Sequence, residues 1–82
     1  MSKDDVRDLV GKNIKRLRIA AGLSQAKLAE RMGVDRAYVS GLELGQRNPT
    51  IVTLWHVGQA LDAKLVSFFA EAKPGRGRPR KG

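Results

Sequence analysis

The sequence of 82 residues predicts one all-α domain at residues 1–72, a compact bundle of five short helices, followed by a disordered basic tail at residues 73–82. Apolar residues recur at steps of three and four through the first part of the chain, as they do along the buried face of a helix. Glycines and one polar loop interrupt this pattern at short intervals, and no period-two alternation indicates a strand. The last ten residues contain no side chain able to build a core.

The first helix is expected at residues 5–21. Aspartates cluster near its start, and lysines and arginines lie toward its end, an arrangement that complements the helix dipole. Gly22 is expected to end this helix, because glycine adopts the left-handed conformation at low cost. The apolar stripe of the helix follows steps of four, four, three and four: Val6, Val10, Ile14, Leu17 and Ala21.

Residues 24–43 predict two short helices joined by a tight turn at Gly33-Val34. Ser24 and Asp35 can cap these helices, because each side chain has an oxygen that can accept a hydrogen bond from the first turn. Gly33 can take the left-handed conformation that the turn between them requires. Two short helices in this arrangement are typical of a helix-turn-helix motif, whose second helix lies in the DNA major groove.

A polar loop at residues 46–49 separates this unit from a fourth helix, which Thr50 can cap and which runs to Leu61. The inward stripe of the fourth helix has the spacing i, i+3, i+4, i+7 at Leu54, Val57, Gly58 and Leu61. Residues 62–64 break the pattern, and a last short helix is expected at residues 65–72.

The composition favours a polyanionic partner and disfavours an enzyme. The net charge is +8, of which five cations and no acid lie in residues 73–82, so residues 1–72 carry only +3. This balance points to nucleic acid first and to an anionic membrane second. The chain has no cysteine, one histidine (His56) and no paired carboxylates, so we expect no metal, no cofactor and no catalytic site. We expect no small-molecule ligand either, because there is no room for a ligand domain.

The N-terminal residues are polar and acidic, with no apolar segment of the kind found in secretory signals. No run of about 18 apolar residues occurs that would predict a membrane span. We therefore expect a cytoplasmic protein, associated with the nucleoid, and no membrane partner.

Residue choices from the second to the fourth helix form one spaced pattern. It consists of Gln25-Ala26, Leu28-Ala29, Gly33, Val39-Ser40, Leu42-Glu43, Gly45, Arg47-Asn48-Pro49-Thr50, Leu54 and Ala60-Leu61. This pattern resembles the phage repressor/Cro-like (XRE-type) helix-turn-helix family, and residues 35–43 are most similar to controller proteins of restriction-modification systems. The resemblance implies a lambda-repressor-like fold. It also implies a homodimer on a two-fold symmetric DNA operator, with one recognition helix per half-site.

The resemblance further implies roles for individual residues. Glu43 would be structural and would hold the loop that follows it. The residues presented to the bases would be Arg36, Ala37, Tyr38 and Gly41, and those on the DNA backbone would be Gln25, Arg47, Asn48, Thr50 and Thr53.

Three of these residues have alternative explanations. Arg36 can form a bidentate hydrogen bond with guanine, worth roughly 1–3 kcal/mol of discrimination, or it can be a solvated arginine or an ion-pair partner along the helix. Tyr38 can pack on a thymine methyl group, bond a phosphate, or be partly buried in the core. Gly41 can read no base edge, so it indicates a close approach either to DNA or to a facing residue of the protein.

The apolar residues of the last two helices are too many for the interior of so small a domain. Exposed apolar patches mark interfaces, so we expect a symmetric dimer formed by these helices. The two subunits would then meet half-sites about 34–36 Å apart. The residues expected at this interface are Ile51, Trp55, Leu65, Val66 and Phe69.

The tail contains Arg76, Gly77, Arg78 and Pro79, which resemble the core of an AT-hook. The narrow minor groove of A·T-rich DNA has an enhanced negative potential that attracts arginine, and minor-groove arms are a known addition to helix-turn-helix domains. The alternative is a generic basic tail that adds non-specific affinity.

Together these features predict a dimeric, sequence-specific transcriptional regulator that acts on double-stranded DNA. Two other functions stay open at this point. One is an antitoxin-type protein, whose main partner is another protein and which regulates its own gene. The other is an architectural protein that coats DNA without sequence preference.

Overall fold

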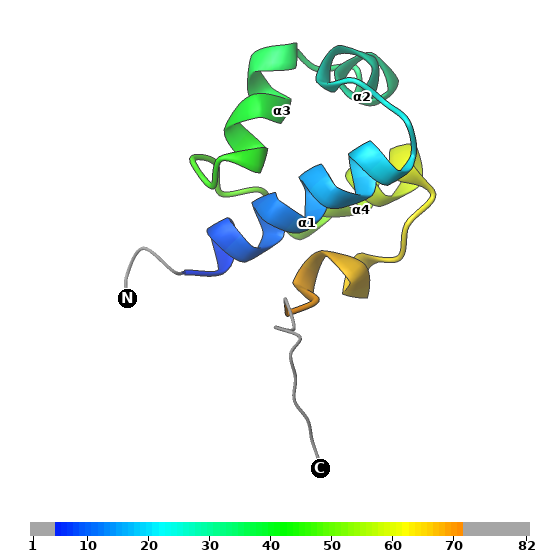
Figure 1. Cartoon of the computed structure of the whole chain (residues 1–82). Coiled ribbons are helices and arrows are strands. Elements are labelled where there is room, and N and C mark those ends of the chain that lie inside the picture. The colour runs from blue at the N-terminus through cyan, green and yellow to red at the C-terminus, as the bar shows by residue number, and fades with distance from the viewer. Residues whose placement is uncertain (1–4, 72–82) are drawn as a thin grey trace.

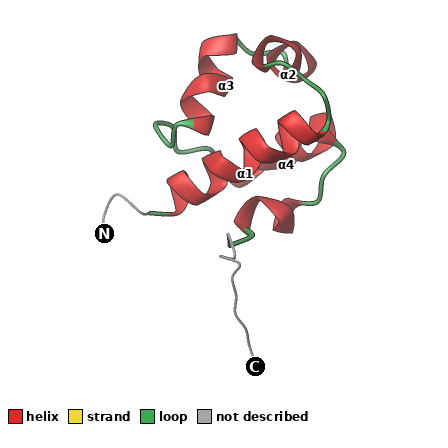
Figure 2. Ribbon diagram, in the orientation of Figure 1, coloured by secondary structure: helices red, strands yellow, loops and turns green. Residues whose placement is uncertain are grey.

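The computed structural model describes residues 5–71, which form four α-helices, one short 3-10 helix and no strand (Figures 1 and 2). The all-α class predicted from the sequence is thereby confirmed. The elements are α1 (Val6–Ala20), α2 (Gln25–Met32), α3 (Arg36–Glu43), α4 (Ile51–Leu61) and the 3-10 helix η2 (Leu65–Phe69). Among the described residues, no helix is long and apolar enough to cross a membrane.

Helix α1 occupies the centre of the arrangement. It contacts α3, α4 and η2, while α2 packs on α3 and α4. Figure 1 shows α2 and α3 together on one side of α1 and η2 on the opposite side. The helix-turn-helix unit and the end of the described chain therefore lie on opposite sides of α1.

The core is built from one to three residues of each element. Phe68 of η2 is completely buried and is the largest side chain of the interior. The expected stripe of α4 is confirmed, because all four of its residues are buried. The stripe of α1 is confirmed only in its middle, since Val6 is exposed and the buried line continues instead through Arg18. The buried apolar side chains are Val10, Ile14, Leu28, Ala29, Val39, Leu42, Leu54, Val57, Leu61 and Phe68.

Three of the four α-helices begin at a side-chain cap, two of which the sequence predicts. The oxygen of each cap accepts a hydrogen bond from a backbone N–H of the first turn. Before α1, the hydrogen bonds from Arg7 lower the pKa of the capping carboxyl, Asp5. The pairs are Arg7 N to Asp5 Oδ1 (2.9 Å), Lys27 N to Ser24 Oγ (3.0 Å) and Thr53 N to Thr50 Oγ1 (3.0 Å).

Asp35 does not cap α3 with its side chain, which corrects the sequence prediction. Its backbone has the extended conformation of a cap residue, but its carboxylate accepts no hydrogen bond from the first turn. The turn at Gly33 (φ 72°) directs the chain out of α2, and the backbone of Asp35 alone begins α3.

All four α-helices end in the same way. A residue with positive φ donates its N–H to a carbonyl three residues back, and the next residue donates to a carbonyl five residues back, which is the Schellman motif. Asp62, which ends α4, is the only described residue other than glycine with positive φ, at 56°. The helix nevertheless ends at Leu61, as expected. The residues with positive φ are Gly22, Gly33, Gly45 and Asp62.

The fifth α-helix expected at residues 65–72 is instead the shorter 3-10 helix η2, and the chain is already extended at Ala70. Asn13 of α1 explains this difference. Its buried side-chain amide donates hydrogen bonds to the carbonyls of Phe68 and Ala70, both at 2.9 Å. These carbonyls are therefore held by α1 and not by a following turn of helix.

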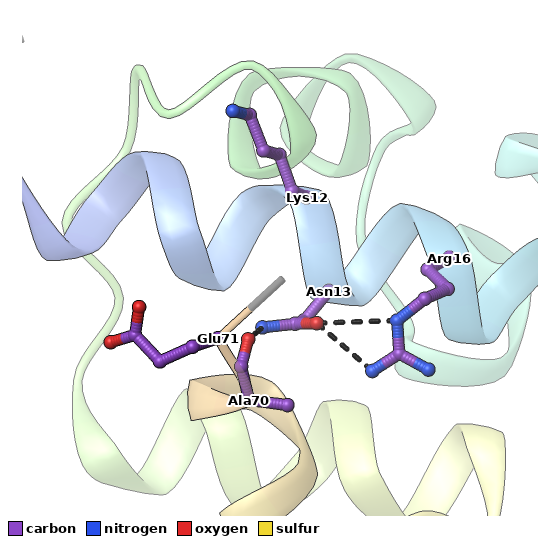
Figure 3. A pocket seen from close by; sticks show the side chains of 5 residues that line it. All are labelled: Lys12, Asn13, Arg16, Ala70 and Glu71. Carbon is purple, nitrogen blue, oxygen red and sulfur yellow. Dashed lines mark hydrogen bonds between the residues drawn. The ribbon is translucent and has the colours of Figure 1, made fainter. Parts of the chain in front are cut away.

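Figure 3 shows this attachment beside a pocket of about 400 Å³ between α1 and the residues after η2. The amide of Asn13 points at Ala70, and the guanidinium of Arg16 donates to the oxygen of the same amide at 2.9 Å. Both ends of the Asn13 amide are therefore bonded, which fixes the backbone of Phe68 and Ala70 against α1.

Gly11 allows α1 to approach the end of α3 closely. A Cβ atom at Gly11 would collide with the carbonyl oxygen of Leu42 and lie 2.7 Å from that of Glu43. These atoms belong to the backbone and cannot move aside as a flexible side chain would. The glycine within α1 thus sets the position of α3 relative to the rest of the domain.

Candidate nucleic-acid interface

The recognition helix α3 presents its first turn to solvent. Arg36 and Ala37 are exposed, whereas Val39 and Leu42 are buried in the core. Tyr38 lies between these two environments, half-buried and packed against the core. Of the four residues expected to face the bases, the exposed ones therefore lie at the start of the helix.

A buried ion pair holds the other end of α3. Arg18 Nε donates to Glu43 Oε2 at 2.6 Å, and Nη2 donates to Oε1 at 3.1 Å. The side chains of the two residues are only 11% and 3% exposed. Arg18 also donates to the carbonyl of Leu23 at 2.8 Å, so it connects α1, the loop after it and α3.

Glu43 is structural, as expected, but its side-chain hydrogen bonds go to Arg18 of α1 and Gln25 of α2 and not to the loop that follows it. Its partner Arg18 was missed in the sequence. A signal was present, because Arg18 follows Val10 and Ile14 at steps of four on the buried face of α1. A cation at a core position requires an anionic partner, and Glu43 is the only buried acid among the described residues.

Gln25 extends this network to the surface. Its Nε2 donates to Glu43 Oε1 at 3.0 Å, and its Oε1 accepts a hydrogen bond from Arg36 Nη1 at 3.0 Å. The guanidinium of Arg36 is thus oriented by a chain of contacts that begins at Arg18 in the core. An arginine side chain has five N–H donors, so most of those on Arg36 stay available to a ligand.

Arg47 reaches back from the loop after α3 onto that helix. Its guanidinium carbon lies 5.1 Å from the centre of the Tyr38 ring, within the range of a cation–π contact. Its side chain also covers Gly41, which is buried and does not lie on the exposed surface of α3. The sequence indicated that Gly41 allows a close approach either to DNA or to a facing residue of the protein. In the structure the facing residue is Arg47.

The remaining residues expected on the DNA backbone lie at the start of α4 or just before it. Asn48 and Thr50 are exposed, and Thr53 is half-buried. The hydroxyl groups of Thr50 and Thr53 are hydrogen-bonded to each other at 3.1 Å. This contact holds both hydroxyls at the N-terminal end of α4, where the helix dipole favours an anion.

A second, apolar surface lies on α4 and η2. Ile51 and Trp55 are one turn apart on α4, and Val66 and Phe69 are one turn apart on η2. Their exposed fractions are 76%, 50%, 71% and 43% in this order. Leu65 departs from the expected set, because it is half-buried against the core.

A groove of about 190 Å³ joins the two halves of this surface. Ile51 and Phe69 both line it, so the exposed apolar residues of α4 and η2 meet at these two positions. The loop before α4 also lines the groove, through Asn48 and Pro49. These two residues directly follow Arg47 in the sequence. The residues around the groove are Val6, Arg7, Val10, Asn48, Pro49, Ile51, Leu54 and Phe69.

A short turn between two helices, with the second helix packed across the first and its start exposed, defines a DNA-binding helix-turn-helix domain. A family model described as "Helix-turn-helix" matches residues 14–68. The match covers more than half of the chain, which therefore belongs to this family.

Two named relatives are similar to this chain over most of their length. The uncharacterized HTH-type transcriptional regulator y4dJ of Sinorhizobium fredii is 49% identical over 64 residues, covering 78% of this chain and 83% of that protein. Control protein C.SmaI of Serratia marcescens is 33% identical over 61 residues, covering 74% and 73%.

Solved structures show the same relationship. The restriction-modification controller protein C.AhdI of Aeromonas hydrophila matches with a TM-score of 0.73 and 41% identity, over 77% of this chain and 96% of that one. The similarity to controller proteins predicted from residues 35–43 is confirmed. The chain is a DNA-binding transcriptional regulator of the helix-turn-helix type, and this is a family of DNA-binding proteins and not of enzymes. The tail residues Arg76, Gly77, Arg78 and Pro79 lie outside the described residues.

Proposed function

We propose that the chain binds a two-fold symmetric operator as a homodimer in the cytoplasm, with one α3 in the major groove of each half-site. The observation that supports this most strongly is the orientation of Arg36. Its guanidinium lies on the exposed first turn of α3 and is held by Gln25, which Glu43 holds in turn. Ordering a long side chain before binding reduces the entropy lost in the complex. An arginine held in this way at the start of a recognition helix is suited to reading guanine.

Apart from Ala37, the other residues around α3 supply position rather than sequence. Ala37 offers only a methyl group, which can contact the methyl group of thymine. Gln25 keeps one N–H and one lone pair unused, and the exposed Asn48 and Thr50 flank the start of α4. These groups are suited to phosphate contacts, which fix the register of a protein on DNA. The position of the operator relative to the promoter would decide whether polymerase is blocked or recruited.

The apolar surface on α4 and η2 supports the dimer. A symmetric pair buries the same patch of both copies, and four large side chains here are exposed in the single chain. The loop before α4 contributes Arg47 to the surface of α3 and Pro49 to the groove. Dimer formation would therefore fix the loop that lies next to the recognition helix.

Replacing Arg36 with alanine is expected to relax the base preference at one position of each half-site, with a loss of roughly 1–3 kcal/mol of discrimination. The salt dependence of binding should hardly change, because no phosphate contact is removed. The measurement compares affinities for the preferred duplex and for duplexes changed at single positions.

Lys64→Ala is the matched control for Arg36→Ala, since it removes an exposed cation at the start of η2, on the far side of α1 from α3. We expect it to leave the base preference unchanged. An equal loss of affinity on every duplex for Arg36→Ala would contradict a role in base readout.

We propose that the tail at residues 73–82 adds contacts in the minor groove. Removing it should reduce the slope of log K against log salt by up to about 4–5 per chain, if its five cations all meet phosphates. An AT-hook further requires that the loss is larger on duplexes with A·T-rich flanks. A loss that is equal on all flanks would instead indicate a generic basic tail, and an unchanged slope would show that the tail does not reach DNA.

A further inference from the structure

Three residues from two segments form one unit on α3. Tyr38 and Gly41 lie three positions apart on the same side of the helix. Arg47 returns to them because the chain reverses after α3, where Gly45 has φ 76° and Gln46 N donates to the carbonyl of Gly41 at 2.9 Å. The stem of the Arg47 side chain then passes over Gly41, and its guanidinium lies over the ring of Tyr38.

The absence of a side chain at Gly41 is what allows this path. A Cβ atom there would lie 3.0 Å from both Cγ and Nε of Arg47 and 3.5 Å from its Cδ. The first two distances are shorter than ordinary contacts, so the Arg47 side chain would have to shift. Glycine is among the poorest residues for a helix interior, so Gly41 does not serve the helix itself. The room that it leaves is used by Arg47.

We propose that Gly41 is a specificity-determining residue of the DNA-binding surface that acts by positioning Arg47. The proposal rests on the function proposed above and adds a second cation to the reading surface. Arg36 is held at the start of α3 by Gln25, and Arg47 is held at its middle by Gly41 and Tyr38. The middle of α3 has no long polar side chain of its own to present to DNA. Arg47 from the following loop supplies one.

Packing on Tyr38 orients the guanidinium of Arg47. A guanidinium stacked on an aromatic ring keeps its N–H groups at the edge of the plane, where they can bond to a base or a phosphate. A single methyl group at position 41 is therefore expected to alter DNA binding without removing any charge or any group that could itself contact DNA.

The test is a double-mutant cycle with Gly41→Ala, Arg47→Ala and the double variant. For each protein, affinity is measured on the duplex preferred by the wild type and on a duplex of scrambled sequence, and urea unfolding is followed. We expect Gly41→Ala alone to weaken preferred binding about tenfold, because residues in contact couple by such factors. Its unfolding midpoint should be unchanged or higher, since alanine favours the helix.

In the Arg47→Ala background, Gly41→Ala should change preferred binding by less than about twofold, because the side chain that it displaces is absent. The slope of log K against log salt should be the same for wild type and Gly41→Ala if only the orientation of Arg47 differs. Equal losses in both backgrounds, or no loss in either, would overturn the proposal. A wild-type protein without any sequence preference would instead refute the proposed function, so the two failures are distinguishable.

Discussion

Replacing Arg18 with methionine is expected to destabilise the domain by about 3–5 kcal/mol, the cost of leaving a buried charge without its partner. The carboxylate of Glu43 would stay almost completely buried, with only the amide of Gln25 to donate to it. Domains of this kind have total stabilities of only about 5–15 kcal/mol. We therefore expect a large fall in the urea midpoint, measured by circular dichroism.

Replacing both members of the ion pair distinguishes the effect of an unpaired buried charge on stability from the effect of lost packing. Arg18→Met together with Glu43→Leu removes both charges and should recover most of the lost stability, because apolar residues often replace a buried pair without cost. The recovered protein should still bind DNA more weakly, since Gln25 loses the acceptor that holds it toward Arg36. Equal stability of wild type and Arg18→Met would show that the pair contributes nothing to the fold.

Replacing Trp55 with lysine is expected to dissociate the proposed dimer. A buried tryptophan at an interface is commonly worth at least about 2 kcal/mol, or roughly 30-fold in the dimer Kd, and a lysine adds an unpaired charge. Sedimentation velocity over a range of concentrations measures the change. Operator affinity should fall by about 10²–10⁴-fold, because two linked half-site contacts become independent.

Ile19→Lys is the matched control for Trp55→Lys. Ile19 is exposed to a similar degree, 57% against 50%, but it lies in the last turn of α1 and not on α4 or η2, which form the apolar surface. We expect it to leave the dimer intact. A Trp55→Lys protein that still forms a dimer would place the interface elsewhere. A wild-type chain that is monomeric would favour the antitoxin-type alternative, in which a different protein covers this surface.

Local sequence signals were sufficient for the helix-turn-helix unit and α4. Ser24 and Thr50 each cap a helix with their own hydroxyl, and Gly33 ends α2, so neighbouring residues determine these boundaries. The inward stripe of α4 follows directly from its spacing. The apolar residues Ile51 and Trp55 were correctly expected at the surface, because a domain of this size cannot bury all of its large side chains.

The features that the sequence did not reveal depend on contacts between distant residues. Glu43 is 25 positions from Arg18, and Asn13 is 55 positions from Phe68. The step-of-four spacing marks Arg18 as a core position of α1 but does not identify Glu43 as its partner, and no periodicity connects Asn13 with Phe68. The pairing of Arg18 with Glu43 and the 3-10 form of η2 were therefore missed. Asp35 shows the opposite case, in which a favoured capping residue stands at the right position and its side chain is not used.

The most direct test of the proposed function is to select bound duplexes from a random pool with the wild-type protein and to sequence them. We expect two copies of one short sequence in inverted orientation, with their centres about 34–36 Å apart or a multiple of that distance. A guanine should recur at the position that Arg36 reads. Selected duplexes that share a single half-site, or no common sequence at all, would contradict a dimer acting on a symmetric operator.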